Sequence, residues 1–167
     1  MLVNPYVQSL ELIPFVKQDE RPEFEERTGL QIKEQGADGS LIPAQERDAY
    51  FPISFAVPFT LNEAALGFDL GSNPERLEAL VMARDQGKAH AMELLRLVES
   101  PDEPTVLMVV APAYYQPSGT IEERRRNLKG YVLGMYRIAQ LVERSAWPGS
   151  SHGLGFLLDY NESYVGH

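Results

Sequence analysis

The sequence predicts a single α+β domain built on a mainly antiparallel sheet with flanking helices. The chain has 167 residues, enough to bury one principal core. Its hydrophobic fraction of 44% and its charged fraction of 23% are typical of folded domains. Short strand-like runs alternate with helical stretches, and hairpin-type connections join neighbouring runs. No internal repeat divides the chain.

The first third of the chain predicts two strands around a short helix. Residues 10–16 form an extended segment in which Pro14 indicates an edge or a bend. Residues 19–28 predict a helix that is anchored by Phe24 and ended by the glycine at position 29. Residues 30–34 alternate apolar and polar side chains, as a half-buried strand does. A polar connection follows, and its Asp38-Gly39 pair suits a tight turn.

Residues 67–87 contain the best-marked helix. Ser72 followed three residues later by Glu75 predicts a capping box, and Pro74 suits the first turn. Gly87 offers a left-handed cap at the other end. The residues at helical spacing that we expect to face the core are Leu77, Leu80, Val81 and Arg84.

The remaining elements are mostly strands. We expect strands at 50–58 and 65–69, which would form a hairpin-like pair before the helix. Further strands are expected at 94–99, 105–114, 128–138 and 154–160, and a short helix at 139–146. The run 105–114 is rich in branched residues and continuous, so it is expected to be central in the sheet.

Charge and composition argue against several classes of partner. The net charge of -9 disfavours binding to nucleic acid or to an anionic membrane surface. The only densely basic run is 124–126, which we interpret as a solvated helix end beside Glu122 and Glu123. The chain has no cysteine, so disulfides and thiolate chemistry are absent. The most apolar run, 106–115, is too short to span a membrane, and no stretch resembles a signal peptide.

No set of residues indicates an enzyme, a metal site or a cofactor. The histidines at 90, 152 and 167 have no second ligand at a suitable spacing. The Ser150-Ser151-His152 sequence lies beside glycine without a nucleophile-elbow motif, so we interpret it as a turn. The many carboxylates are spread over the chain without a paired acid and base. An enzymatic function is therefore the weakest hypothesis.

A series of short motifs runs in order along nearly the whole chain. They are Ala-Leu-Gly-Phe-Asp-Leu at 65–70, Ala-Arg-Asp-Gln-Gly at 83–87, Arg-Leu-Val at 96–98, Val-Val-Ala-Pro-Ala-Tyr at 109–114 and Leu-Lys-Gly-Tyr-Val-Leu-Gly at 128–134. This ordered set resembles the CHASE domain, the extracytoplasmic sensor module of bacterial signalling receptors and plant cytokinin-receptor kinases.

The resemblance implies a PAS-like main sheet that holds a ligand on its concave face beneath the helix that begins near Ser72. It implies a membrane-distal part at about 30–138. It also implies a membrane-proximal part from 1–29 and 139–167, with a smaller sheet formed by the first residues and 154–160. Family members carry a long stalk helix before this region and a transmembrane helix on each side. Neither is in this sequence, as expected of the periplasmic part of an inner-membrane receptor excised between its membrane segments.

The resemblance further implies a homodimeric receptor with a cytoplasmic output, such as a histidine kinase of a two-component system, a diguanylate cyclase or a phosphodiesterase. It places the pocket wall on Val98, Val110, Tyr131, Gly134 and Met135. These residues would form a small apolar cavity with one hydroxyl, as small-ligand pockets generally have. By their residue types alone, Tyr131 and Met135 would be assigned to the core.

Arg76 stands where the plant cytokinin receptors have an aspartate that binds adenine. Its five donors replace an acceptor-only carboxylate, which argues against an adenine-type cytokinin and for an anionic ligand. The alternative is a solvent-facing Arg76 paired with Asp69 or Asn73. Asp69 either contacts the ligand or, as aspartates before turns commonly do, braces the backbone ahead of it.

The leading hypothesis is therefore a sensor domain that captures a small molecule. The alternative is a dimerisation or protein-interaction domain without a small ligand.

Overall fold

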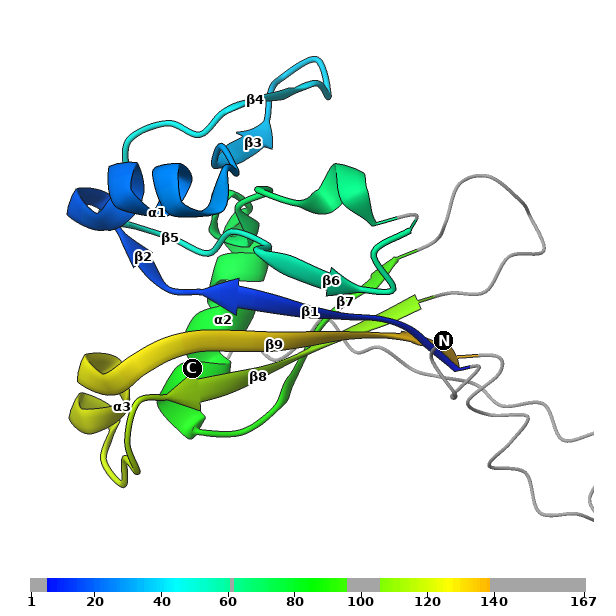
Figure 1. The fold of residues 1–167 in the computed structure, drawn as a ribbon. Coiled ribbons are helices and arrows are strands. Elements are labelled where there is room, and N and C mark those ends of the chain that lie inside the picture. Colours follow the sequence, from blue (N-terminus) through cyan, green and yellow to red (C-terminus); the bar gives the residue numbers. More distant parts are fainter. Residues whose placement is uncertain (1–5, 61, 96–105, 139–167) are drawn as a thin grey trace, which may run out of the picture.

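The computed structural model describes residues 6–60, 62–95 and 106–138 of the chain. Its main feature is a five-stranded antiparallel sheet in the order β6-β1-β9-β8-β7 (Figure 1). The strands are β1 (Val7–Pro14), β6 (Phe55–Val57), β7 (His90–Leu95), β8 (Val106–Tyr114) and β9 (Leu128–Arg137). Two small two-stranded sheets pair β2 (Val16–Lys17) with β5 (Ala49–Tyr50) and β3 (Lys33–Gln35) with β4 (Leu41–Pro43).

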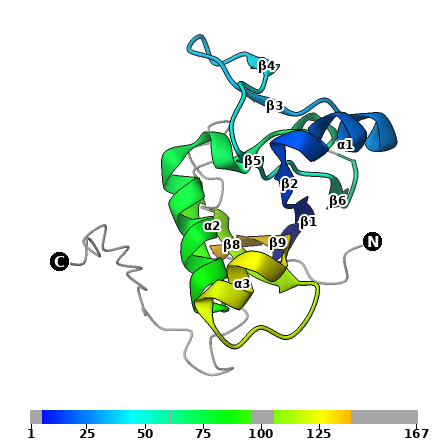
Figure 2. The same ribbon diagram turned by 90° about the vertical axis from the view of Figure 1, so that its left-hand side faces the viewer.

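The described residues contain three α-helices, which leave the outer face of the main sheet uncovered. α1 (Arg21–Thr28) lies with the two small sheets at one end of the molecule (Figure 1). α2 (Pro74–Gln86) packs on β7 and β8, and α3 (Ile121–Asn127), in the connection between β8 and β9, lies beside it (Figure 2). Short 3-10 turns occupy Gln18–Glu20, Glu63–Ala65 and Leu70–Ser72. The predicted α+β class with a mainly antiparallel sheet is confirmed.

The strand order places β9 in the middle of the sheet. β8, which was expected to be central, is the inner strand next to it. β1 lies between β6 and β9, but β6 pairs only with Leu10, Glu11 and Leu12. Pro14, the last residue of β1, is paired with β9 alone, which agrees with the edge or bend that this proline predicted. Residues 7–14 thus share one sheet with strands of the 30–138 part, and the predicted boundary near residue 29 does not separate β1 from them.

The predicted strand at 65–69 does not form as a regular strand. Residues 63–65 form a 3-10 turn, and the following residues make isolated bridges, Pro52 with Asp69 and Lys33 with Phe68. The predicted pairing with the preceding segment is present as backbone hydrogen bonds from Gly67 to Ile53 at 2.8 Å and from Ile53 to Phe68 at 3.0 Å. Gly67 adopts a φ of 84°, and a Cβ there would lie 2.3 Å from the carbonyl oxygen of Gln31. A left-handed residue at such a close approach interrupts an extended strand.

The N-cap of α2 is Asn73, one residue later than predicted. The side chain of Asn73, instead of Ser72, accepts a hydrogen bond from the backbone N–H of Arg76 at 3.0 Å. Ser72 instead donates its hydroxyl to the carbonyl of Asp69 at 2.7 Å. At the other end Gly87 is the left-handed cap, as predicted, with φ 66°.

The buried face of α2 is formed mainly by small residues. Ala79, Leu80 and Ala83 are buried, whereas Leu77, predicted to face the core, is 37% exposed. The two alanines let the helix approach β7 and β8 closely. These three residues belong to the main core cluster, whose members are Ile13, Phe51, Ile53, Leu70, Ala79, Leu80, Ala83, Met92, Met108, Val110, Leu128, Tyr131 and Leu133.

β1 turns its polar side chains inward. Ser9 and Glu11 are buried together with Ile13, while Leu10 and Leu12 are 39% and 48% exposed. On the outer face of the sheet the two leucines pair with other exposed apolar residues of β6 and β9, namely Phe55, Val57 and Val132. The main sheet therefore presents an apolar stripe to the outside as well as an apolar core face.

Several predicted elements lie outside the described residues, namely most of the strand at 94–99, the helix at 139–146 and the strand at 154–160. The smaller sheet expected from 154–160 lies outside them as well. Within the described residues, none of the helices has the length and apolar character that crossing a membrane requires.

Candidate functional site

The residues predicted to line a pocket lie on β8 and β9, except Val98, which is outside the described residues. Val110 and Tyr131 are buried in the core, and the half-buried Met135 packs against it. Because side chains alternate along a strand, Tyr131 and Met135 share the face covered by the core. Gly134 lies between them, and a Cβ there would meet the ring of Tyr136 at 2.6 Å. The structure thus brings Val110, Tyr131 and Met135 together on one face of the sheet.

Two tyrosines of this sheet hold α2 in place. The hydroxyl of Tyr131 donates to the carbonyl of Leu80 at 2.8 Å, and its ring meets Phe51 edge-on with centroids 5.8 Å apart. The hydroxyl of Tyr114 donates to the carbonyl of Arg84 at 2.6 Å. Burial raises the pKa of Tyr131, so it stays a donor at any physiological pH. The one hydroxyl assigned to the pocket wall is therefore also a contact between the sheet and α2.

α3 fastens the C-terminal end of α2. Arg125 pairs with the carboxylate of Asp85 at 2.6 Å, and Arg124 donates to the carbonyl of Asp85 at 2.7 Å. Arg84 also pairs with this carboxylate at 2.7 Å. The hydrogen bonds from Arg125 and Arg84 hold the pKa of Asp85 well below its ordinary value. The run 124–126 forms the end of α3, as predicted, and Arg125 and Arg126 are exposed. Arg124 is half-buried, so the prediction of a solvated side chain is wrong for this arginine.

Arg76 lies in the first turn of α2 and is half-buried. Its guanidinium carbon lies 5.8 Å from the centroid of the Phe68 ring, close enough for a cation–π contact. Phe68 itself packs against the core. The contact between Arg76 and Asn73 is made by the backbone of Arg76, so it does not fix the guanidinium. A ligand contact by Arg76 stays a prediction.

Asp69 braces the backbone that leads into α2. It is completely buried and accepts hydrogen bonds from the backbone N–H groups of Phe51 at 2.7 Å and Gly71 at 3.0 Å. Arg47 pairs with its other oxygen at 2.9 Å. Burial raises the pKa of this carboxyl, against the lowering effect of the three donors. The bracing interpretation is confirmed, and a direct ligand contact by Asp69 stays a prediction.

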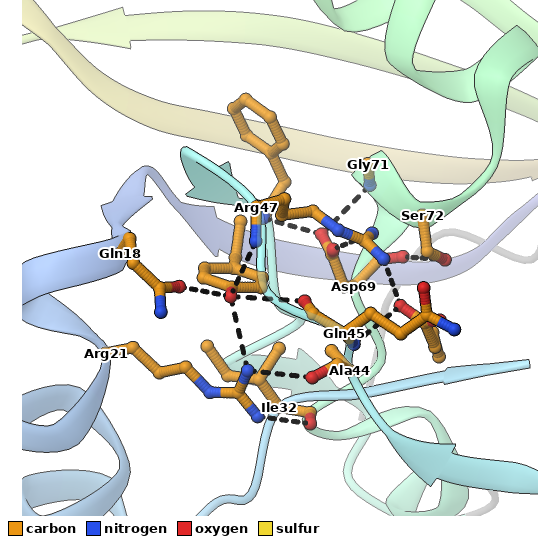
Figure 3. Close-up of polar contacts among 12 residues, drawn as sticks. Gln18, Arg21, Ile32, Ala44, Gln45, Arg47, Asp69, Gly71 and Ser72 are labelled. Atoms are coloured by element: carbon orange, nitrogen blue, oxygen red, sulfur yellow. Dashed lines mark hydrogen bonds and ion pairs between the residues drawn. The ribbon is translucent and has the colours of Figure 1, made fainter.

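The sequence did not indicate the polar network around Arg47 (Figure 3). Arg47 joins the carboxylates of Glu34 and Asp69, and Glu34 also accepts from the backbone N–H of Gln45 at 3.2 Å. The partners of Arg47 lie 13 and 22 residues away in the chain, inside segments with ordinary loop and strand patterns. No local spacing could have paired them.

A second branch of this network converges on the hydroxyl of Tyr50, which is buried. Arg21 Nη1 and the backbone N–H of Arg47 both donate to it at 3.2 Å, and Gln18 is a further partner (Figure 3). Arg21 also donates to the carbonyl of Ala44 at 2.8 Å. The network thus ties α1 to the loop before β5. The polar groups of the network form hydrogen bonds and ion pairs with one another, which indicates a structural role.

The described residues contain no group of three or more histidines, aspartates or glutamates that could hold a metal ion.

Comparison with known proteins gives one positive result. The family of CHASE domains matches residues 2–162, nearly the whole chain. None of the curated proteins matches the sequence. Because the match covers far more than half of the chain and the sheet has the expected architecture, this protein belongs to the CHASE domain family of extracytoplasmic sensor domains of signalling receptors.

Proposed function

We propose that this chain is the periplasmic ligand-binding domain of a transmembrane receptor, and that it captures a small molecule between the core face of the main sheet and α2. The supporting observation is that Val110, Tyr131 and Met135 lie on one sheet face, close to the helix that carries Arg76. The receptor would be dimeric, with a histidine kinase or a cyclic-di-GMP enzyme as its cytoplasmic output.

Arg76 would fix the orientation of the bound ligand. A guanidinium beside an apolar wall binds a carboxylate or another anion through paired hydrogen bonds, and partial burial strengthens them. The Phe68 ring next to the guanidinium supports its orientation. The ligand would then be a small anionic molecule, and an adenine-type cytokinin is disfavoured.

Signal transmission would involve a shift of α2. Val110 and Tyr131 are buried, so a ligand reaches them only when the helix moves relative to the sheet. The hydrogen bonds that resist this movement are those from Tyr131 to Leu80 and from Tyr114 to Arg84. A ligand that binds the shifted arrangement more tightly changes the population of the two states, whereas equal affinity for both transmits nothing.

A thermal-shift screen with amino acids, organic acids and purines tests the proposal. A ligand at one hundred times its dissociation constant adds about 2.7 kcal/mol to the free energy of unfolding. For an anionic hit, Arg76→Ala should weaken binding at least about tenfold, measured by calorimetry. Arg126→Ala, which removes an exposed arginine of α3, is the control. Unchanged affinity in Arg76→Ala would contradict the role of Arg76.

The alternative function is dimerisation or protein interaction without a small ligand. The exposed apolar residues on the outer face of the sheet favour it, since such surfaces often mark protein contacts. This alternative would replace the sensor proposal if no compound in the screen binds and light scattering shows a dimer that Phe55→Ser dissociates.

A further inference from the structure

β1 carries a polar pair on the buried face of the main sheet. Ser9 is 0% exposed and Glu11 is 2% exposed. The Ser9 hydroxyl donates to Glu11 Oε1 at 3.0 Å. Directly opposite Glu11 on the two neighbouring strands stand Ala56 and Leu133, whose side chains have no hydrogen-bond donor.

Glu11 differs from the other buried carboxylates of this domain. Asp69 and Glu34 each accept from Arg47 and from at least one backbone N–H. Among the described residues, the partner of Glu11 is the Ser9 hydroxyl alone. Burial raises the pKa of Glu11, as expected for a carboxyl with so few donors. A carboxyl placed in this way does not stabilise the fold, because its desolvation is poorly compensated.

A second acceptor on the same strand is also unsatisfied. Gln8 lies where the register between β1 and β9 shifts, between Val7 and Ser9. Its Oε1 is buried and has no hydrogen-bond partner among the described residues. Gln8 Oε1 is thus a second buried acceptor on β1, in addition to the Glu11 carboxyl with its single donor.

This polar pair adjoins the residues proposed to contact the ligand. Met135 stands directly opposite Ser9, and Met108 stands opposite Met135. Methionine side chains adapt their shape more readily than other core residues, which suits a wall that must change on binding. We infer that Glu11, held in orientation by Ser9, anchors the ligand by accepting a hydrogen bond from a nitrogen donor such as an ammonium, an amidinium or an amide.

The inference rests on the proposed sensor function and narrows its ligand class to molecules that carry an N–H donor. The test uses butylamine, 1,4-diaminobutane and benzamidine, each compared with a neutral counterpart of similar size that has no N–H or O–H donor: methyl propyl ether, 1,2-dimethoxyethane and acetophenone. Thermal shift and calorimetry are measured on the wild type, on Glu11→Gln and on Glu78→Gln, which changes an exposed glutamate of α2.

The expected result is that at least one nitrogen compound raises the unfolding midpoint and its counterpart does not. Glu11→Gln should lower the affinity for that compound at least about tenfold, because a charge-assisted hydrogen bond is lost. Glu78→Gln should leave this affinity unchanged. Equal affinity in Glu11→Gln would overturn the inference, and so would binding of the counterparts alone. If no nitrogen compound binds while the broader screen yields another ligand, this inference fails and the sensor proposal stands.

A measurement without ligand separates a binding group from a structural one. Replacing a poorly compensated carboxyl by an apolar side chain should keep the unfolding midpoint or raise it by about 2–4 °C in Glu11→Leu. A fall of more than about 5 °C in both Glu11→Leu and Glu11→Gln would show that the carboxyl supports the fold, and the inference would be wrong.

Discussion

One carboxylate, that of Asp69, joins three segments of the chain. It accepts from the backbone at Phe51 and Gly71 and pairs with the side chain of Arg47. Asp69→Asn keeps the shape but turns an amide NH2 toward donors and removes the charge that Arg47 neutralises. We expect the free energy of unfolding in urea to fall by about 2–4 kcal/mol.

Asp19→Asn provides the matched control, because it makes the same chemical change at an exposed side chain. It should alter stability by no more than about 0.5 kcal/mol. A loss of similar size in both variants would mean that the bonds of Asp69 do not determine the stability of this turn.

The sequence identified Asp69 as a brace of the turn. It did not identify its partner Arg47, or the buried pair of Ser9 and Glu11 on β1. An aspartate before a turn is a local feature, and Asp69 followed that rule. In the run Leu10-Glu11-Leu12, hydropathy alone favours buried leucines, and the structure reverses the faces. Both faces of β1 carry apolar neighbours, so alternation along one strand could not decide which face is inside.

The contact between α2 and α3 leads to a prediction for a graded series of variants. Arg124 donates to the carbonyls of Asp85 and Gly119 from a half-buried position, Arg125 pairs with Asp85 from a more exposed one, and Arg126 is exposed. Stability should therefore fall most in Arg124→Ala, by about 1–2 kcal/mol. Arg125→Ala should lose less, and Arg126→Ala should change little. Equal losses in all three would indicate an effect of charge on helix propensity instead of specific contacts.

The same contact makes stability depend on pH in acid. The folded state lowers the pKa of Asp85 below the ordinary value of 3.8, so its ionised form contributes stability at pH values above that value. This contribution is lost as the pH falls further and the carboxylate takes up a proton. Asp85→Asn should thus be less stable than the wild type at pH 7, and the difference should narrow steadily as the pH falls below 3.8, as measured by urea unfolding. Parallel pH curves for the two proteins would contradict this effect.

Elements were predictable where their ends are marked by local chemistry. Gly29 and Gly87 end α1 and α2, both in the left-handed conformation. Ser72 and Asn73 are adjacent and equally good caps, so the sequence could not choose between them. The face of α2 was misplaced because Leu77 is more hydrophobic than Ala79, while close packing on the sheet requires the smaller side chain.

At the scale of the whole molecule, two properties oppose each other. The net charge of -9 keeps molecules apart at neutral pH, and the outer sheet face exposes Phe55 at 52% and Leu12 at 48%. Near the isoelectric point of about 4.8 the repulsion vanishes, so self-association through this face should increase. Light scattering at pH 5 should show less association for Phe55→Ser and Leu12→Ser than for the wild type.

Leu41→Ser is the control for these variants, because Leu41 is 47% exposed on β4, outside the main sheet. It should associate as the wild type does. Undiminished association of the Phe55 and Leu12 variants would place the contact elsewhere.

The sequence predicted the charge and the class of fold, but exposure of this face depends on strand order, which pairs residues far apart in the chain.

The pairing of β1 with β9 has a mechanical consequence. The two strands run antiparallel from Val7 opposite Tyr136 to Pro14 opposite Gly130, and the backbone N–H of Arg137 donates to the carbonyl of Tyr6 at 2.8 Å. The start of β1 and the end of β9 therefore lie side by side and are joined by backbone hydrogen bonds (Figure 1). Sliding one past the other requires the whole ladder of hydrogen bonds to break. A tilt of the sheet therefore moves Val7–Pro14 and Leu128–Arg137 together as one rigid unit.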